Sequence, residues 1–176
     1  MKRILIIGSC GSGKSTFARR LGKATGLEVI HLDRLYWKPN WVGTTDEDEW
    51  RKTVEIALQG KAWIIDGNYS GTLAMRLQAC DTVVFLDFPR TICVFRVLKR
   101  VAFYRKGSRP DMADGCDEKI DWDFVKWIWN YPTRSKPKVE TLLDQHQDTT
   151  TIIRLKSKKE IENFFVKYSA NAVESF

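Results

Sequence analysis

A glycine-rich octapeptide near the amino terminus places the strongest constraint on how this chain can fold. Residues 8–15 read GSCGSGKS and fit the pattern G-x-x-x-x-G-K-[ST], the P-loop. An isoleucine-rich run at 3–7 precedes the motif, and 14–25 follows it with apolar side chains at helical spacing. The short apolar run predicts a buried parallel strand, and the periodic segment predicts a helix that ends at Gly26. The motif therefore predicts a strand, a tight loop and a helix in immediate succession.

The spacing of this motif suits a phosphate. Backbone N–H groups can wrap a phosphate only where side chains do not obstruct them, which favours glycine, and the amino end of the helix points its amides at the same group. We expect Lys14 to reach the β- and γ-phosphates of a nucleotide and the Ser15 hydroxyl to ligate Mg²⁺. The expected ligand is therefore ATP with Mg²⁺. The predicted nucleotide-binding residues are Gly8, Ser9, Cys10, Gly11, Ser12, Gly13, Lys14, Ser15 and Thr16.

Strand-like and helix-like segments alternate along the rest of the chain. The pattern predicts further strands at 27–32, 62–65, 82–88 and 150–155, and a loop at 33–44. Helices are expected from Asp46-x-x-Glu49 to Gly60, around 73–78, at 89–103, 119–131 and 138–146, and after Ser157-x-x-Glu160. This alternation predicts an α/β protein with a parallel sheet between two layers of helices. Its 176 residues favour a single domain over 1–176.

The positive charge of the chain is concentrated in one segment. The net charge is +7, and 89–110 contains seven Lys and Arg residues but no Asp or Glu, so the remaining 22 basic residues balance the 22 acidic ones. Such a segment suits either nucleic acid or a phosphate-binding lid. The composition of 104–117, with Gly, Pro and alternating charges, favours a mobile lid loop there.

The cysteine spacing and the lengths of the apolar runs argue against other classes of protein. The four cysteines form no CxxC pair, which argues against a zinc or thioredoxin-like site. No apolar run approaches the roughly 18 residues of a membrane span, and the start of the chain lacks the pattern of a signal peptide. We therefore expect a cytoplasmic protein with no membrane partner.

Several motifs together resemble one family. They are the P-loop, His31-Leu32-Asp33, the stretch WIIDGNY at 63–69, FLDFPR at 85–90 and GSRPD at 107–111. In this combination the chain, from residue 1 to about 156, resembles the adenylate-kinase-related proteins often called DNA topology modulation proteins. The resemblance implies a P-loop kinase fold of the nucleoside and nucleotide kinase type, with five parallel strands in the order 2-3-1-4-5 and a short lid. It does not imply a substrate.

The resemblance also implies roles for acidic and basic residues. Asp66 is similar to the Asp of the Asp-Gly pair that helps hold Mg²⁺ through water in adenylate kinases; the alternative is a turn-forming residue. Arg96 and Arg100 resemble the arginine pair before the lid, of which one lies near adenine and one near the phosphates. In the lid itself, Arg105 and Arg109 would stabilise the transferring phosphoryl group. Lys14, Arg100, Arg105 and Arg109 are therefore candidate catalytic residues, and Arg96 is a candidate nucleotide-binding residue.

Asp33 is the candidate catalytic residue on the acceptor side. It follows the second strand, where ligands collect in open α/β sheets, and resembles the acid that small-molecule kinases use to bind the acceptor or accept its hydroxyl proton. The alternative is a helix or turn cap. Asp66-Gly67 is followed by no arginine until Arg76, unlike in adenylate kinases, which argues against a nucleoside monophosphate acceptor unless Arg34 compensates.

Aromatic residues also surround this predicted acceptor site in the sequence. Trp37 and Trp41 could stack on a base or sugar or could simply pack, whereas Trp50 lies on a helical stripe and should pack.

Three functions fit these features. The leading one is phosphoryl transfer from MgATP to a small acceptor, which could be a nucleotide, a nucleoside or another hydroxyl compound. The second is an ATP-dependent regulatory or DNA-binding protein, although the arginine-bearing segment 93–103 is largely apolar and does not resemble a DNA-recognition helix. The third is a nucleoside triphosphatase that uses water as the acceptor.

Overall fold

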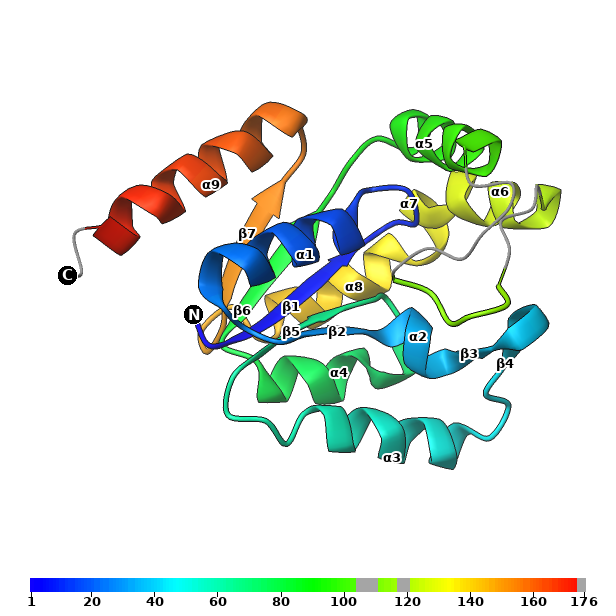
Figure 1. The fold of residues 1–176 in the computed structure, drawn as a ribbon, viewed down its shortest axis with the longest axis horizontal. Helices are drawn as coiled ribbons and strands as arrows, with labels where there is room; N and C mark the ends of the chain where they lie inside the picture. The colour runs from blue at the N-terminus through cyan, green and yellow to red at the C-terminus, as the bar shows by residue number, and fades with distance from the viewer. Residues whose placement is uncertain (104–110, 117–120, 174–176) are drawn as a thin grey trace.

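The computed structural model describes residues 1–103, 111–116 and 121–173, and a five-stranded parallel sheet forms its centre (Figure 1). The strands are β1 (Arg3–Gly8), β2 (Val29–His31), β5 (Trp63–Asp66), β6 (Thr82–Leu86) and β7 (Thr151–Leu155). Their order across the sheet is β2-β5-β1-β6-β7. Numbered along the chain, the strands of this sheet follow the order 2-3-1-4-5, which confirms the expected topology.

Helices cover both faces of the sheet (Figure 1). They are α1 (Lys14–Thr25), α2 (Leu32–Tyr36), α3 (Glu47–Ala57), α4 (Ser70–Ala79), α5 (Arg90–Phe103), α6 (Trp122–Trp129), α7 (Tyr131–Arg134), α8 (Lys136–Asp144) and α9 (Lys158–Val173). Alternate residues of β1 enter two separate cores, because successive side chains of a strand point to opposite faces. Ile4 and Ile6 pack with α1, α5 and α9, whereas Leu5 and Ile7 pack with α3, α4 and α8.

The carboxyl ends of three neighbouring strands meet at one edge of the sheet. The register pairs Ile6 of β1 with Asp66 of β5, and Asp66 with His31 of β2. The P-loop follows β1 directly and leads into α1, as the motif predicts. This edge therefore places the P-loop beside Asp66 and His31, which are far apart in the sequence.

The segment expected to be a loop at 33–44 is instead structured. It contains most of α2, the antiparallel pair β3 (Trp37–Lys38) and β4 (Val42–Gly43), and a 3₁₀ turn, η1 (Pro39–Trp41), between them. The strand expected to reach residue 32 ends at His31, because Leu32 begins α2. The short hairpin has no long apolar alternation, so the sequence pattern did not reveal it.

The helix expected at 119–131 is also different. It is divided into α6 and α7, and Pro132 lies in the first turn of α7, where a missing N–H costs little. Residues 104–110 and 117 of the predicted lid lie outside the described residues, so only 111–116 of that segment can be placed. Within the described parts of the chain, no helix is long and apolar enough to cross a membrane.

The amino end of α3 offers a direct test of the fold. The Asp46 carboxylate accepts hydrogen bonds from the backbone N–H groups of Asp48 and Glu49, at 2.9 and 3.1 Å, so it caps the helix as the sequence predicts. We expect Asp46→Ala to lower the free energy of unfolding by about 1 kcal/mol, measured by urea denaturation. Glu49→Ala is the control, since its side chain caps nothing. An equal loss in both variants would contradict the cap.

Candidate functional site

The P-loop wraps tightly between β1 and α1. A Cβ atom added to Gly11, which has φ +79°, would lie 2.2 Å from the carbonyl oxygen of Cys93 on α5, so only glycine fits between the two segments. The Lys14 ammonium donates to the Ser9 carbonyl oxygen, at 3.0 Å, across the loop. The loop thus has the compact form that the motif predicts, with Lys14 folded over it.

A single large cleft runs from the P-loop past the ends of β2 and β5. Its volume is about 1380 Å³, above the roughly 300–1,000 Å³ of a single-ligand pocket, so it has room for a donor and an acceptor together. Six of the nine predicted nucleotide-binding residues line it: Cys10, Gly11, Gly13, Lys14, Ser15 and Thr16. Ser9 and Ser12 are instead buried and do not line the cleft.

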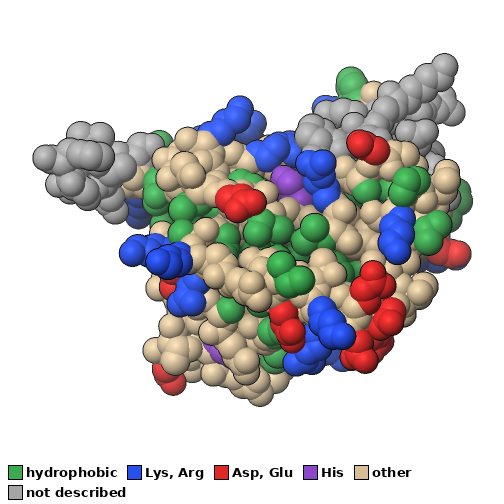
Figure 2. Space-filling model, turned by 60° about the horizontal axis from the view of Figure 1, so that its bottom comes forward, with side chains coloured by type: hydrophobic (Ala, Val, Ile, Leu, Met, Phe, Trp, Pro, Cys, Tyr) green, Lys and Arg blue, Asp and Glu red, His purple; other side chains and the backbone are tan. Residues whose placement is uncertain are grey.

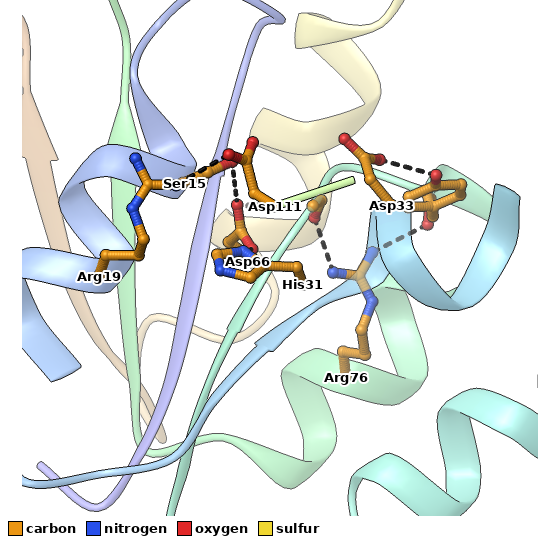
Figure 3. Close-up of polar contacts among 9 residues, drawn as sticks. Ser15, Arg19, His31, Asp33, Asp66, Arg76 and Asp111 are labelled. Carbon is orange, nitrogen blue, oxygen red and sulfur yellow. Dashed lines mark hydrogen bonds and ion pairs between the residues drawn. The ribbon is translucent and has the colours of Figure 1, made fainter. Parts of the chain in front are cut away.

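Ser15, Asp66 and His31 form a hydrogen-bonded chain beside the P-loop (Figure 3). The Ser15 hydroxyl donates to one carboxylate oxygen of Asp66 at 2.8 Å, and Nδ1 of His31 lies 2.5 Å from the other. The side chains of His31 and Asp66 are only 9% and 5% exposed. The carboxylate is therefore held in one orientation, with its neighbouring hydroxyl at the cleft.

These oxygens suit Mg²⁺, which prefers hydroxyl, carboxylate, water and phosphate oxygens. The Ser15 hydroxyl and the Asp66 carboxylate lie side by side at the amino end of α1, next to the loop that would hold the phosphates. Among the described residues, no group of three or more His, Cys, Asp or Glu side chains could hold a metal ion. A cation at Ser15 and Asp66 would accordingly share its coordination with the phosphates of a nucleotide.

The loop after β5 is anchored by a buried arginine. The side chain of Arg76 on α4 has no exposed surface, and its guanidinium donates to the carbonyl oxygens of Gly67, Asn68, Tyr69 and Thr72 at 2.8–3.3 Å. Burial lowers the pKa of Arg76 to about 10. Asn68 in turn accepts a hydrogen bond from the backbone N–H of Gly8, at 3.1 Å, which joins this loop to the P-loop.

Asp33 lies on the other side of the cleft from the P-loop (Figure 3). The Tyr69 hydroxyl donates to its carboxylate at 2.7 Å. Burial, followed by the charge of Asp33, raises the pKa of Tyr69, so the phenol stays protonated as a donor. Asp33 is half-buried and lines the cleft.

The predicted arginines of α5 also reach the cleft. Arg96 donates to the carbonyl oxygen of Ser12, at 2.9 Å, and its guanidinium lies 4.5 Å from the centre of the Phe88 ring. Arg100 lines the cleft and is half-buried. The two lid residues Arg105 and Arg109 lie outside the described residues.

Sequence reasoning missed several residues of this site. Five residues were not predicted as site residues, yet each makes a hydrogen bond to a residue of the predicted site, of the cleft lining or of the loop after β5: His31, Asn68, Tyr69, Arg76 and Asp111. Asp111 is buried and accepts from Arg19 of α1 at 2.8 Å (Figure 3). The contact between His31 and Asp66 could have been predicted from strand order and register, because each residue ends its strand and the two strands are neighbours in the sheet. Nothing in the sequence spacing signals the role of Arg76.

Removal of the Arg76 guanidinium tests whether it holds the loop. We expect Arg76→Met to lower the free energy of unfolding by at least about 2 kcal/mol, since it leaves four carbonyl groups without their donor. Arg51→Met is the control: Arg51 is exposed and pairs with the exposed Glu55 at 3.3 Å, so a change within about 0.5 kcal/mol is expected. Urea denaturation measures both. Equal effects would show that Arg76 is not an anchor.

Known proteins resemble this chain in structure rather than in sequence. No family model matches the chain, and neither does any curated protein. A solved structure of deoxyadenosine kinase from M. mycoides with bound dATP aligns with a TM-score of 0.51 and 15% identity, and covers 95% of this chain and 98% of that chain. Another structure of that kinase, with the products dCMP and a flexible dCDP bound, aligns with a TM-score of 0.51 and 16% identity over the same shares.

At 15–16% sequence identity, the similarity to this kinase is a similarity of fold. The chain has the five-stranded parallel sheet and flanking helices of the P-loop nucleoside kinases.

Proposed function

We propose that this protein is a kinase that transfers the γ-phosphoryl group of MgATP to a hydroxyl group of a small acceptor. One observation supports this most: a single cleft joins the P-loop and the Ser15–Asp66 pair to Asp33, which Tyr69 holds on the opposite side. The fold of the chain, which is that of nucleoside kinases, agrees with this function.

On the donor side, the chain binds and orients the triphosphate. The P-loop amides, the amino end of α1 and Lys14 surround the β- and γ-phosphates, while Arg96 and Arg100 approach from α5. Ser15 and Asp66 would hold Mg²⁺, Asp66 through water, and the cation would neutralise charge that develops on the phosphate oxygens. The lid role of Arg105 and Arg109 remains a prediction; there they would place positive charge near the transferring phosphoryl group.

On the acceptor side, Asp33 directs the hydroxyl group. Its carboxylate accepts the hydroxyl proton as the acceptor oxygen bonds to the γ-phosphorus, and the bond from that phosphorus to the bridging oxygen of ADP breaks. Tyr69 holds Asp33 in place, and the Arg76-anchored loop holds Tyr69. The products are ADP and a phosphorylated acceptor.

The acceptor could be a nucleoside, a nucleotide or another hydroxyl compound. The two aligned structures described above are of a deoxyadenosine kinase, which makes nucleosides reasonable first candidates. Membership of the topology modulation family, a cytoplasmic location and DNA binding stay predictions. Arg96 and Arg100 line the cleft, so at least part of the basic segment serves this site. DNA binding through several phosphates should weaken steeply with salt.

Measurement of ADP release tests this function. We expect MgATP turnover to rise with one class of small molecule in a panel of deoxynucleosides, their 5′-monophosphates, sugars and duplex DNA, and Lys14→Ala to abolish it. Asp33→Asn should lower kcat by about 10²–10⁴-fold, since it removes the proton acceptor.

Asp144→Asn is the matched control, because Asp144 is an exposed carboxylate at the end of α8 that does not line the cleft. Stimulation by DNA alone, or no stimulation at all, would contradict the kinase function. Full activity of Asp33→Asn would contradict the role of that residue.

A further inference from the structure

We propose that the acceptor is an unphosphorylated compound with a flat ring and a hydroxyl group, and that the cleft selects against phosphorylated acceptors. This inference rests on the proposed kinase function and concerns the half of the cleft that faces the P-loop. We call this half the acceptor side, defined as the cleft-lining residues within 33–51 and 67–72.

Aromatic rings form much of the acceptor side. They come from α2, the β3–β4 hairpin, α3 and the loop after β5, and are Tyr36, Trp37, Trp41, Trp50 and Tyr69. The centres of adjacent rings lie 4.9–5.5 Å apart. All five line the cleft; Trp50 is buried, whereas the other four are half-buried. Because such faces stack on planar ligands, the wall suits a ring-bearing acceptor.

Among the described residues, the cations that could bind an acceptor phosphate are engaged or lie outside the acceptor side. Arg76, the first arginine after Asp66-Gly67, is fully buried and donates to four backbone carbonyl groups. Arg34 is exposed and does not line the cleft. Arg51 is the one cation among the described residues of the acceptor side, and it pairs with Glu55.

Carboxylates dominate the charge of the same surface. Asp33, Glu47 and Asp48 line the acceptor side against the single cation Arg51, a balance of three negative charges to one positive. The amino end of α3, otherwise a favourable place for a phosphate, is already capped by Asp46 and carries acidic residues throughout its first turn. Figure 2 shows acidic side chains gathered at the right of this face, where α3 begins.

The donor side has the opposite charge. Its cleft-lining cations are Lys14, Arg19, Arg96 and Arg100, and the cleft-lining carboxylate Asp111 pairs with Arg19. The rim of the cleft near α6–α8 adds two carboxylates and two cations: Asp121, Asp123, Arg134 and Lys138. Their charges cancel, so the difference in charge between the donor side and the acceptor side is unchanged. The cleft thus separates a basic half that suits a triphosphate from an acidic, aromatic half that repels a second phosphate.

Matched pairs of acceptors test this selection. We would compare deoxyadenosine, deoxyguanosine, deoxycytidine and thymidine with their 5′-monophosphates, first by phosphoryl transfer and then by calorimetric binding with Mg²⁺ and a non-hydrolysable ATP analogue. We expect the preferred nucleoside to exceed its monophosphate by about tenfold or more in both readouts, the scale of one like-charge contact near a protein surface.

Charge and ring variants identify the cause. Glu47→Gln combined with Asp48→Asn should reduce the preference for the nucleoside at least about threefold, because two of the three repelling charges are gone. Glu49→Gln is the matched control, since Glu49 lies in the same turn but does not line the cleft. Trp37→Leu should raise KM for nucleosides about tenfold through loss of stacking.

The failure of this inference is distinct from failure of the kinase function. Equal or better use of the monophosphates, or transfer only to hydroxyl compounds without a ring, would overturn the inference and leave the kinase standing. Binding of none of the eight probes would also overturn it. Absence of any acceptor-stimulated ADP release that depends on Lys14 would instead overturn the kinase function.

Discussion

The parallel register of β1, β5 and β2 is the constraint on which the site depends. Because parallel strands all end at the same edge, the chain delivers the P-loop, Asp66 and His31 to neighbouring positions although they are separated by tens of residues. The hydrogen bonds from Ser15 and His31 to Asp66 exist only in this register. A shift of one residue would turn Asp66 into the core on the opposite face, where a carboxylate would have no partner.

A second constraint is the burial of charge around the same edge. Arg76 lies within the protein interior, and its burial is offset by hydrogen bonds to four carbonyl groups, three in the loop after β5 and one in the first turn of α4. That loop contains Asn68, which contacts the P-loop, and Tyr69, which holds Asp33. A buried cation therefore connects the donor and acceptor halves of the cleft, and the stability of the loop and the geometry of the proposed chemistry have a common cause.

Much of this could be predicted from local sequence pattern. The P-loop, the boundaries of α1, the cap at Asp46 and the order of the strands follow from short-range signals and one family resemblance, and the structure confirms them. The hairpin at Trp37–Gly43 was missed because two-residue strands produce no periodic pattern. Arg76 entered the prediction only as the first arginine after Asp66-Gly67, since its burial depends on how α4 packs against the loop after β5. His31 gave no local signal because its partner, Asp66, becomes adjacent only through strand pairing.

The central claim is that this edge of the sheet binds a nucleotide together with Mg²⁺. Calorimetric titration of ATP, with and without Mg²⁺, into the native protein and into Asp66→Asn tests it most directly. The account predicts that Mg²⁺ tightens ATP binding to the native protein and that this gain is largely lost in Asp66→Asn, while Mg²⁺-free binding persists. ATP binding that is indifferent to Mg²⁺, or an equal gain in the variant, would contradict it.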